Sequence, residues 1–476
     1  MIVTRIGNGA GAAGGIRRQL PEDTLLVFLS DTHIGGAAGG DIFQSAAELT
    51  LLLEDLDRHR GPVELVLAGD FLDLLRMEDA IGTRDRVAAT IGRPEYRELF
   101  AALRAFAGGP GHRVVYLAGN HDAEAWWNPR VQRSLQQAGL VEEFGLSYAA
   151  RFGPHPGQLV YCEHGNQFDP VNALTDYANP LDTPVGAHVL TEAIRPIGSR
   201  AATTSGIDLR EVRYVFPIAA HPGPAEWVAG RIFYQFLGQM LRWLLVLLAF
   251  LVVAYVATAA LAVVLGRAGG GPWALRSLLV EATYGAAVLV FALAVVFLVS
   301  RRTTRDVLTT LASRFPWLAP ESERSREEAA IRRLLEDGGA PPMAADVSSL
   351  EVAVFVSGHT HAPAVSELAR AGGGRTVVAN PGCWLRQLQP VAAWLGGPPV
   401  FVPAFVHTHL RVRSSPAGLT VELWDHPKPA ERRLPWIERA AVAGRMPRQP
   451  PPAAGPRLLA RHLVPRRSVP VEGGPR

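Results

Sequence analysis

Metal-binding side chains follow five apolar, strand-like runs of this sequence, at the point where each run ends. The residues are Asp31, His33, Asp70, Asn120, His164, His359 and His361. Oxygen and imidazole donors without thiolates suit divalent ions such as Mn, Fe or Zn. Any one of these residues alone is more often structural than a ligand. Five strand ends that all carry ligands nevertheless predict a metal centre.

The spacing of the ligands indicates how they would act together. Asp31 and His33, like His359 and His361, are separated by one residue, and at a strand end this spacing can aim both side chains at one point. Asp70 stands between the two pairs in the sequence and could bridge two ions with its two oxygens. Two ions about 3.5–4 Å apart can activate a water molecule and clamp an in-line displacement at phosphorus.

The runs that end in these ligands alternate with helical patterns. Apolar runs at 24–36, 63–75 and 112–122 are separated by segments of helical spacing at 48–60 and 95–109. This order predicts βαβ units, and in open α/β sheets ligands bind beyond the carboxyl ends of the strands. The fold class we expect is therefore α/β.

Further strands are expected later in the chain. Runs at 158–169 and 351–363 carry the remaining ligands, and RTVVANPGCW, PAFVHTHLRVRS and GLTVELWD after His361 resemble strands of a second sheet. His407 and His409 repeat the His-x-His spacing, but no glycine turn precedes them. We interpret both as structural, and Cys162 as a packed thiol.

Composition limits the class of protein. The chain has 476 residues, a net charge of +3 and two cysteines, which argues against a nucleic-acid footprint and against a disulfide framework. The first 24 residues lack the apolar core of a signal peptide. We expect residues 1–23 to be flexible, and residues 431–476, rich in Pro and Arg, to be disordered or to lie on an anionic membrane surface.

Two long apolar spans interrupt the chain between His164 and His359. Trp243–Leu265 has 23 residues without a charge, and Ala282–Ser300 has 19. Each is long enough to cross a bilayer as a helix, although a pair of buried core helices is the alternative. Arginines gather on the outer flanks of the two spans, which predicts a multi-pass inner-membrane protein with its flanks and catalytic domain in the cytoplasm.

The blocks DTH, GDFLD, GNHD, HG and GHTH, in that order and followed by NPGC at 380–383, resemble the signature of calcineurin-like metallophosphoesterases. The resemblance implies a two-sheet metallophosphoesterase sandwich with a dinuclear site. It assigns one ion to Asp31, His33, Asp70 and His361, and the other to Asp70, Asn120, His164 and His359. It makes His121 the catalytic residue facing the phosphate, oriented by Asp122 from behind.

The resemblance implies hydrolysis of a phosphomonoester, phosphodiester or pyrophosphate with two divalent ions such as Mn, Fe or Zn. HGNQFD and GHTHAP are also similar to the UDP-2,3-diacylglucosamine pyrophosphatase branch, which often has arginine at the position of His121. A membrane anchor would suit a lipid-linked substrate. The alternative is a non-catalytic membrane-anchored scaffold, because the retromer scaffold subunit resembles this family.

The expected organisation has five parts. They are a flexible N-terminus at 1–23, the first part of the metallophosphoesterase domain at 24–170, a helical insert with transmembrane spans at 171–350, the second part of the domain at 351–430, and a Pro/Arg-rich tail at 431–476.

Overall fold

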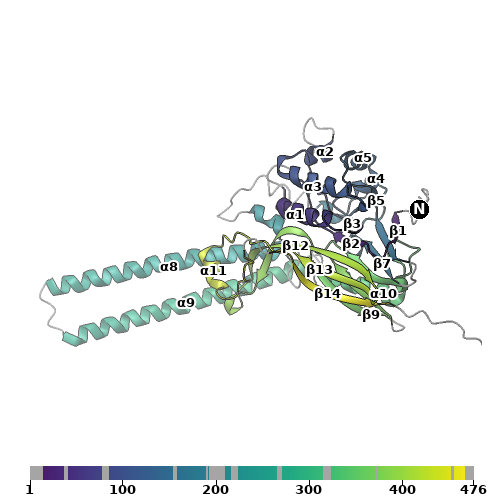
Figure 1. Ribbon diagram of the computed structural model, residues 1–476. Helices are drawn as coiled ribbons and strands as arrows, with labels where there is room; N and C mark the ends of the chain where they lie inside the picture. The colour runs from purple at the N-terminus through teal and green to yellow at the C-terminus, as the bar shows by residue number, and fades with distance from the viewer. Residues whose placement is uncertain are drawn as a thin grey trace, which may run out of the picture.

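Two β-sheets pack face to face, and a long helical hairpin projects from one end of the sandwich (Figure 1). This computed structural model describes residues 14–36, 41–77, 85–153, 158–188, 191, 209–215, 223–264, 271–314, 323–370, 374–451 and 455–466.

The first sheet has eight strands in the order β14-β13-β12-β2-β3-β4-β5, with β11 paired to β12. Strands β2, β3, β4 and β5 are parallel, as the predicted βαβ units require. The strands are β2 Leu25–Leu29, β3 Val63–Ala68, β4 His112–Leu117, β5 Glu143–Gly145, β11 Trp384–Val391, β12 Val400–Ser415, β13 Gly418–Asp425 and β14 Arg457–Pro465.

The second sheet has six strands in the order β1-β6-β7-β8-β10-β9. They are β1 Gly15–Leu20, β6 Ser147–Phe152, β7 Leu159–Glu163, β8 Val352–Ser357, β9 Ala364–Ala369 and β10 Arg375–Asn380. Strands β7 and β8 are parallel neighbours although the whole insert separates them in the chain. This pairing brings the segment after His164 beside the segment that carries His359.

Alternate residues of the parallel strands build two cores. Leu25, Val27 and Leu29 of β2 face the helix layer, whereas Leu26 and Phe28 face the other sheet. Strands buried on both faces have this continuous apolar character. The helices outside the projecting hairpin and the C-terminal region are α1 Ala46–Asp57, α2 Arg86–Ile91, α3 Arg97–Ala107, α4 Glu124–Trp127, α5 Pro129–Gln137, α6 Val185–His188 and α10 Glu323–Asp337.

Helix α10 covers the outer face of the second sheet, because its Ile331 and Leu335 are buried with Tyr161 and Phe355. Short 3₁₀ helices connect several elements. They are η1 Pro94–Tyr96, η2 Asn166–Phe168, η4 Leu209–Tyr214, η6 Ser349–Glu351 and η7 Trp394–Gly396.

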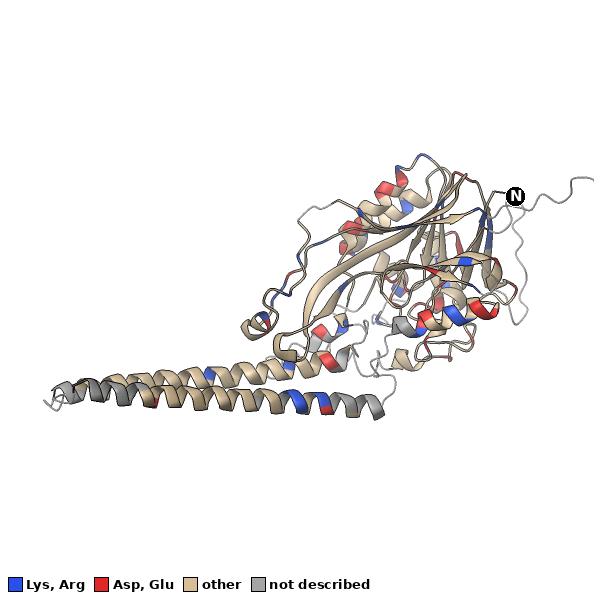
Figure 2. Ribbon diagram, turned by 90° about the horizontal axis from the view of Figure 1, so that it is seen from below, with Lys and Arg blue, Asp and Glu red and all other residues tan. Residues whose placement is uncertain are grey.

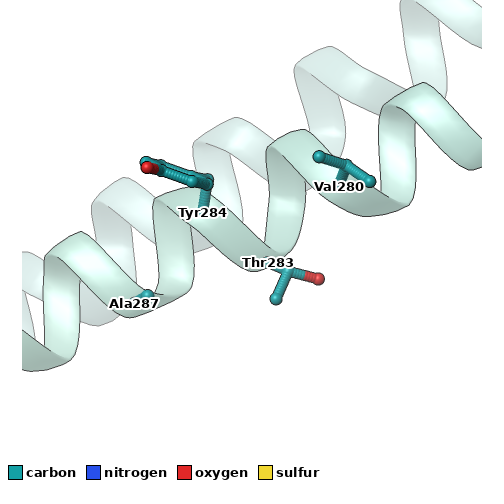
Figure 3. Close-up of a pocket in the computed structure, with 4 residues that line it drawn as sticks. All are labelled: Val280, Thr283, Tyr284 and Ala287. Atoms are coloured by element: carbon teal, nitrogen blue, oxygen red, sulfur yellow. The ribbon is translucent and has the colours of Figure 1, made fainter.

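Helices α8 Pro224–Val264 and α9 Gly271–Arg314 form the projecting pair, which we call the hydrophobic hairpin (Figure 1). Each has an apolar window of mean hydropathy 2.5 with none of it buried, so both are long and apolar enough to cross a membrane. Figure 3 shows a shallow hollow on α9 between Val280, Thr283, Tyr284 and Ala287, all of them exposed. The alternative of buried core helices is not what the structure shows for these windows.

The base of the hydrophobic hairpin is part of the sandwich domain. Trp227 is buried with Cys383 and Leu385, and further along α8 Phe233 is buried with Val391. Strand β11 therefore runs from the neighbourhood of Cys383 to the hairpin base.

Phe297 of α9 also contacts the domain. Its ring centroid lies 5.8 Å from that of Phe233, and it packs against the same apolar cluster as Val391. The last turn of the predicted span at 282–300 is thus in contact with protein.

Three expectations were wrong: that residues 15–20 are flexible, that the described part of the tail is disordered, and that the strands after His361 all belong to the second sheet. The alternative that the tail lies on an anionic membrane surface stays a prediction. Residues 15–20 form β1, because Ile16 and Leu20 are buried in the core. Residues 436–441 form helix α11 Trp436–Ala441, and 457–465 form β14, whose Arg461 pairs with Glu422 of β13 at 2.7 Å. The strands after His361 divide between the sheets, since β10 joins β8 whereas β12 and β13 extend the first sheet. Residues 1–13 and 467–476 lie outside the described residues.

Candidate metal centre

The carboxyl ends of the strands bring most of the predicted ligands together. Ligand atoms within 4.8 Å of one another form three groups: Asp31, His33 and His361; Asp31, Asp70 and His164; and His33, Asp73 and His121. The groups share Asp31 and His33, so they make one continuous cluster. Only Asp73 was not among the predicted site residues.

The distances inside the cluster show polar atoms that converge on shared points. His361 Nε2 lies 3.1 Å from His33 Nε2 and 3.2 Å from Asp31 Oδ1. His164 Nε2 lies 3.3 Å from Asp70 Oδ2 and 3.2 Å from the amide oxygen of Asn120. Converging imidazoles and carboxylates are the arrangement that a cation stabilises.

The donor set fits divalent metal ions. Oδ1 of Asp31 is buried and makes no hydrogen bond within the part of the chain that the structure describes, although Nε2 of His361 lies 3.2 Å away. A buried polar atom without a partner costs about 1–3 kcal/mol, so a ligand for such atoms is expected. Nitrogen and oxygen donors without thiolates agree with the ions that the sequence predicts.

The backbone is strained at the same positions. Among the described residues other than glycine, six have a positive φ, and five of them are predicted ligands: Asp31 (54°), His33 (49°), Asp70 (52°), His359 (65°) and His361 (55°). Such conformations cost roughly 1–3 kcal/mol each and persist where the surroundings impose them, often at functional sites. The turn after each strand thus aims its ligand at the cost of local stability.

Glycine at position 119 allows the end of β4 to lie close to two predicted ligands. A Cβ atom added there would overlap the carboxylate of Asp70 and the ring of His164. The glycine of GNHD therefore permits the close approach of β4 to two predicted ligands from other strands.

Residues 24–195 match the family model of the calcineurin-like phosphoesterases. The chain contains a calcineurin-like phosphoesterase domain. The predicted resemblance is thereby confirmed, and the two sheets agree with the predicted sandwich. A search of the curated proteins found no match.

Asp73, and not Asp122, holds His121 in the calcineurin-like phosphoesterase domain. Nδ1 of His121 lies 3.0 Å from Oδ1 of Asp73. Asp122 instead accepts hydrogen bonds from the Tyr116 hydroxyl at 2.5 Å and the Gly119 amide at 2.6 Å. The prediction that Asp122 orients His121 was wrong, because the carboxylate points back toward β4. The signal for Asp73 was its place three residues after Asp70 in GDFLD.

Charge pairing sets the protonation of this part of the domain. Burial alone would lower the pKa of His121, but the carboxylates of Asp73 and Asp70 raise it above its usual value. Burial alone would likewise raise the pKa of Asp70, yet the His164 imidazole beside it brings it well below its usual value. Asp122 has its pKa raised to about 6 by burial and by the nearby Asp70.

His359 is the predicted ligand that the clusters above do not include. Its ring centroid lies 5.4 Å from that of His164, but its Nε2 lies 3.2 Å from Oδ2 of Asp169. The carboxyl of Asp169 is buried, which raises its pKa, but His359 lowers that pKa to about 2. Asp169 lies in the HGNQFD block, and its contact with His359 could not be read from the spacing.

The second His-x-His pair serves packing. His407 and His409 are fully buried in β12, and Nε2 of His407 lies 2.6 Å from the Ser45 hydroxyl. The Trp384 ring stacks on His407 with 5.2 Å between ring centroids. Neither histidine belongs to a cluster of possible metal ligands among the described residues.

Proposed function

We propose that this protein hydrolyses a phosphoester with two divalent metal ions. The observation that carries the proposal is the buried cluster of histidines and aspartates on strained turns, within a calcineurin-like phosphoesterase domain. Asp31, His33, Asp70 and His361 would hold one ion, and Asp70, Asn120, His164 and His359 the other. Such ions, when bound, polarise the phosphoryl oxygens and activate water.

His121 is the proposed catalytic residue of the chain itself. Its side chain is 18% exposed, whereas the side chains of His33 and Asp73 are almost fully buried, so it can reach a bound phosphate. The Asp73 carboxylate fixes the imidazole by its bond to Nδ1 and leaves Nε2 free to face the substrate. From there a protonated His121 would donate a proton to the leaving oxygen.

A hydrolase fits the site better than a scaffold does. A scaffold that had lost its chemistry would not need a buried cluster of converging carboxylates and imidazoles or five ligands on strained backbone. These features cost stability, and a metal-dependent reaction gives them a use.

The hydrophobic hairpin supports a place at the membrane. Its apolar surface is exposed along the windows that suit a bilayer, and arginines at 301, 302 and 305 of α9 follow the second apolar span. We propose that α8 and α9 cross the membrane with the catalytic domain on the cytoplasmic side, and that the substrate is amphiphilic or lipid-linked.

The test begins with full-length protein purified in detergent. Bound metal is measured by mass spectrometry, and turnover is measured on chromogenic monoesters, diesters and a nucleotide pyrophosphate. Asp70→Asn should lose both metal and turnover, because one carboxylate serves both ions. Asp55→Asn, a control at an exposed carboxylate of α1, should lose neither. A wild-type protein that binds metal but cleaves no phosphoester would favour the scaffold.

A further inference from the structure

Two segments of the catalytic domain clasp the hydrophobic hairpin at its base. Helix α11 is tied to α8 by Arg231, whose Nη1 donates to both carboxylate oxygens of Glu438 at 2.9 and 2.8 Å. The loop after η7 is tied to the same helix, since the Tyr234 hydroxyl donates to the Pro398 carbonyl at 2.5 Å. Figure 1 shows α11 beside the hairpin, at the end of the domain from which the hairpin projects, and Figure 2 shows the same end of the domain from below.

These two segments expose large apolar side chains beside the hairpin. Trp394 and Leu395 of η7 are 50% and 78% exposed, and Trp436 of α11 is 38% exposed. Leu395 also has a φ of 57°, the one positive φ among described non-glycine residues that the metal centre does not account for. A strained turn that presents a leucine to the outside suggests a contact surface.

Arginines accompany the exposed aromatic rings. The guanidinium of Arg445 lies 3.8 Å from the centre of the Trp394 ring, and Arg301 of α9 lies against Gly396. Arg242 of α8 and Trp436 line a cavity of about 230 Å³ between α8 and α11, and the paired Arg231 and Glu438 line it as well. Tryptophan together with arginine is the composition of membrane–water interfaces that carry anionic lipid.

Helix α11 and Arg242 lie at the position along α8 where a headgroup layer is expected, next to the uncharged run. Ile437 of α11 packs against Gly238, and Arg242 borders the cavity one turn later. The uncharged run begins directly afterwards, at Trp243, which is 74% exposed. Helix α11 therefore ends where the apolar part of the hairpin starts, whereas the loop after η7 meets α8 earlier, at Gly230 and Tyr234.

We propose that these residues form a base collar that sits in the headgroup layer of an anionic bilayer. The base collar consists of Trp394, Leu395, Trp436, Arg242, Arg301 and Arg445. The three apolar side chains enter the interface, and the cavity beside Arg242 takes the phosphate of an anionic phospholipid. The inference rests on the proposed membrane crossing of α8 and α9, and adds that the domain itself binds the lipid surface.

Quenching of tryptophan fluorescence by brominated lipids tests the base collar in full-length protein reconstituted into liposomes. Trp394→Phe and Trp436→Phe should each remove a quenched component of the emission. Trp243→Phe reports on the crossing itself and should remove another. Trp424→Phe, a control in β13, should remove only unquenched emission.

The outcomes separate the base collar from the hairpin. Quenching of Trp243 without quenching of Trp394 and Trp436 would overturn the base collar and leave the crossing intact. Quenching of none of the three would overturn both.

The choice of lipid tests the cavity. At equal mole fraction, brominated phosphatidylglycerol should quench Trp436 more than brominated phosphatidylcholine, and Arg242→Gln should abolish the difference. Equal quenching by both lipids in the unmodified protein would overturn the anionic site.

Discussion

Replacing Asp73 by Asn separates its role from that of Asp122. Asn keeps the shape of the side chain but removes the negative charge opposite Nδ1 of His121, which lies 3.0 Å away. A hydrogen bond to a charged group contributes about 1.5–3 kcal/mol. Since each 1.36 kcal/mol of barrier is tenfold in rate, turnover should fall roughly 10- to 150-fold.

The assay compares turnover of a chromogenic phosphodiester at saturating metal with the metal content of the same sample. Asp73→Asn should keep its metal, because the carboxylate acts through His121. His121→Ala should also keep its metal and lose about 10²–10⁴-fold in turnover, the usual contribution of a general acid. In the His121→Ala background, Asp73→Asn should then cause no further loss, since the two residues act as a unit.

Two results would refute this reasoning. An equal fall in turnover in both backgrounds would show that Asp73 does not act through His121. A loss of bound metal in Asp73→Asn would instead assign the residue to His33, whose Nδ1 lies 3.6 Å from Asp73 Oδ2. Asp122→Asn is the matched comparison: it should lower the free energy of unfolding by about 1–3 kcal/mol, because its buried oxygens accept from Tyr116 and Gly119.

Four further predictions follow from the structure. Gly119→Ala should lose bound metal because the added methyl overlaps Asp70 and His164, whereas Gly455→Ala, with open space around it, should not; equal metal contents would contradict the packing. Burial lowers the pKa of His407 from 6.5 to about 3. The neutral imidazole therefore contributes fully to stability above pH 6.5, and this contribution is lost as the pH falls from 6.5 toward 3. Urea unfolding should therefore show the unmodified protein losing about 2 kcal/mol more than His407→Gln between about pH 7.5 and about pH 5, and parallel losses would refute a neutral buried imidazole. Reporter fusions at Gly271 and after Arg476 should lie on opposite sides of the membrane, and signals from one side would contradict the crossing. Replacing residues 243–293 by a short linker should give a soluble enzyme that keeps its metal and cleaves small phosphoesters but not membrane-embedded ones, whereas replacing Ser205–Ser325 also removes the buried Trp227 and Phe233 and should destabilise the domain.

The ligand positions were predictable because local sequence determines them. A buried strand ends where polar residues begin, and parallel neighbours end at one edge of the sheet, so Asp31 and Asp70 had to approach each other. The partner of His121 was not predictable in this way. Asp73 and Asp122 are both near His121 in the fold, and only the path of the turn after each strand decides which carboxylate faces the ring.

The assignment of strands to sheets and the order of the C-terminal tail were harder to predict from the sequence, for a different reason. Strand β10 and strand β12 have similar apolar patterns, and long-range pairing with β8 or β2 assigns them to different sheets. In the tail, Pro and Arg dominate the composition and hide the alternation of RLLARHLVP. Pairing of β14 with the edge of β13 supplies the order that composition alone did not indicate.

Strand β11 connects the candidate metal centre to the base of the hydrophobic hairpin. The amide of Trp384 at its start donates to the Asp31 carbonyl at 3.2 Å, and Val391 at its end packs beside Phe233 at the hairpin base. Eight residues at about 3.3 Å each make this strand about 23 Å from first to last Cα. If α8 and α9 cross a bilayer and β11 runs along the bilayer normal, a phosphorus atom at the glycerol of an ordinary phospholipid would be out of reach. In that arrangement we would expect substrates whose scissile bond is carried outward by a long polar headgroup, such as a nucleotide or an oligosaccharide, or substrates that leave the bilayer altogether.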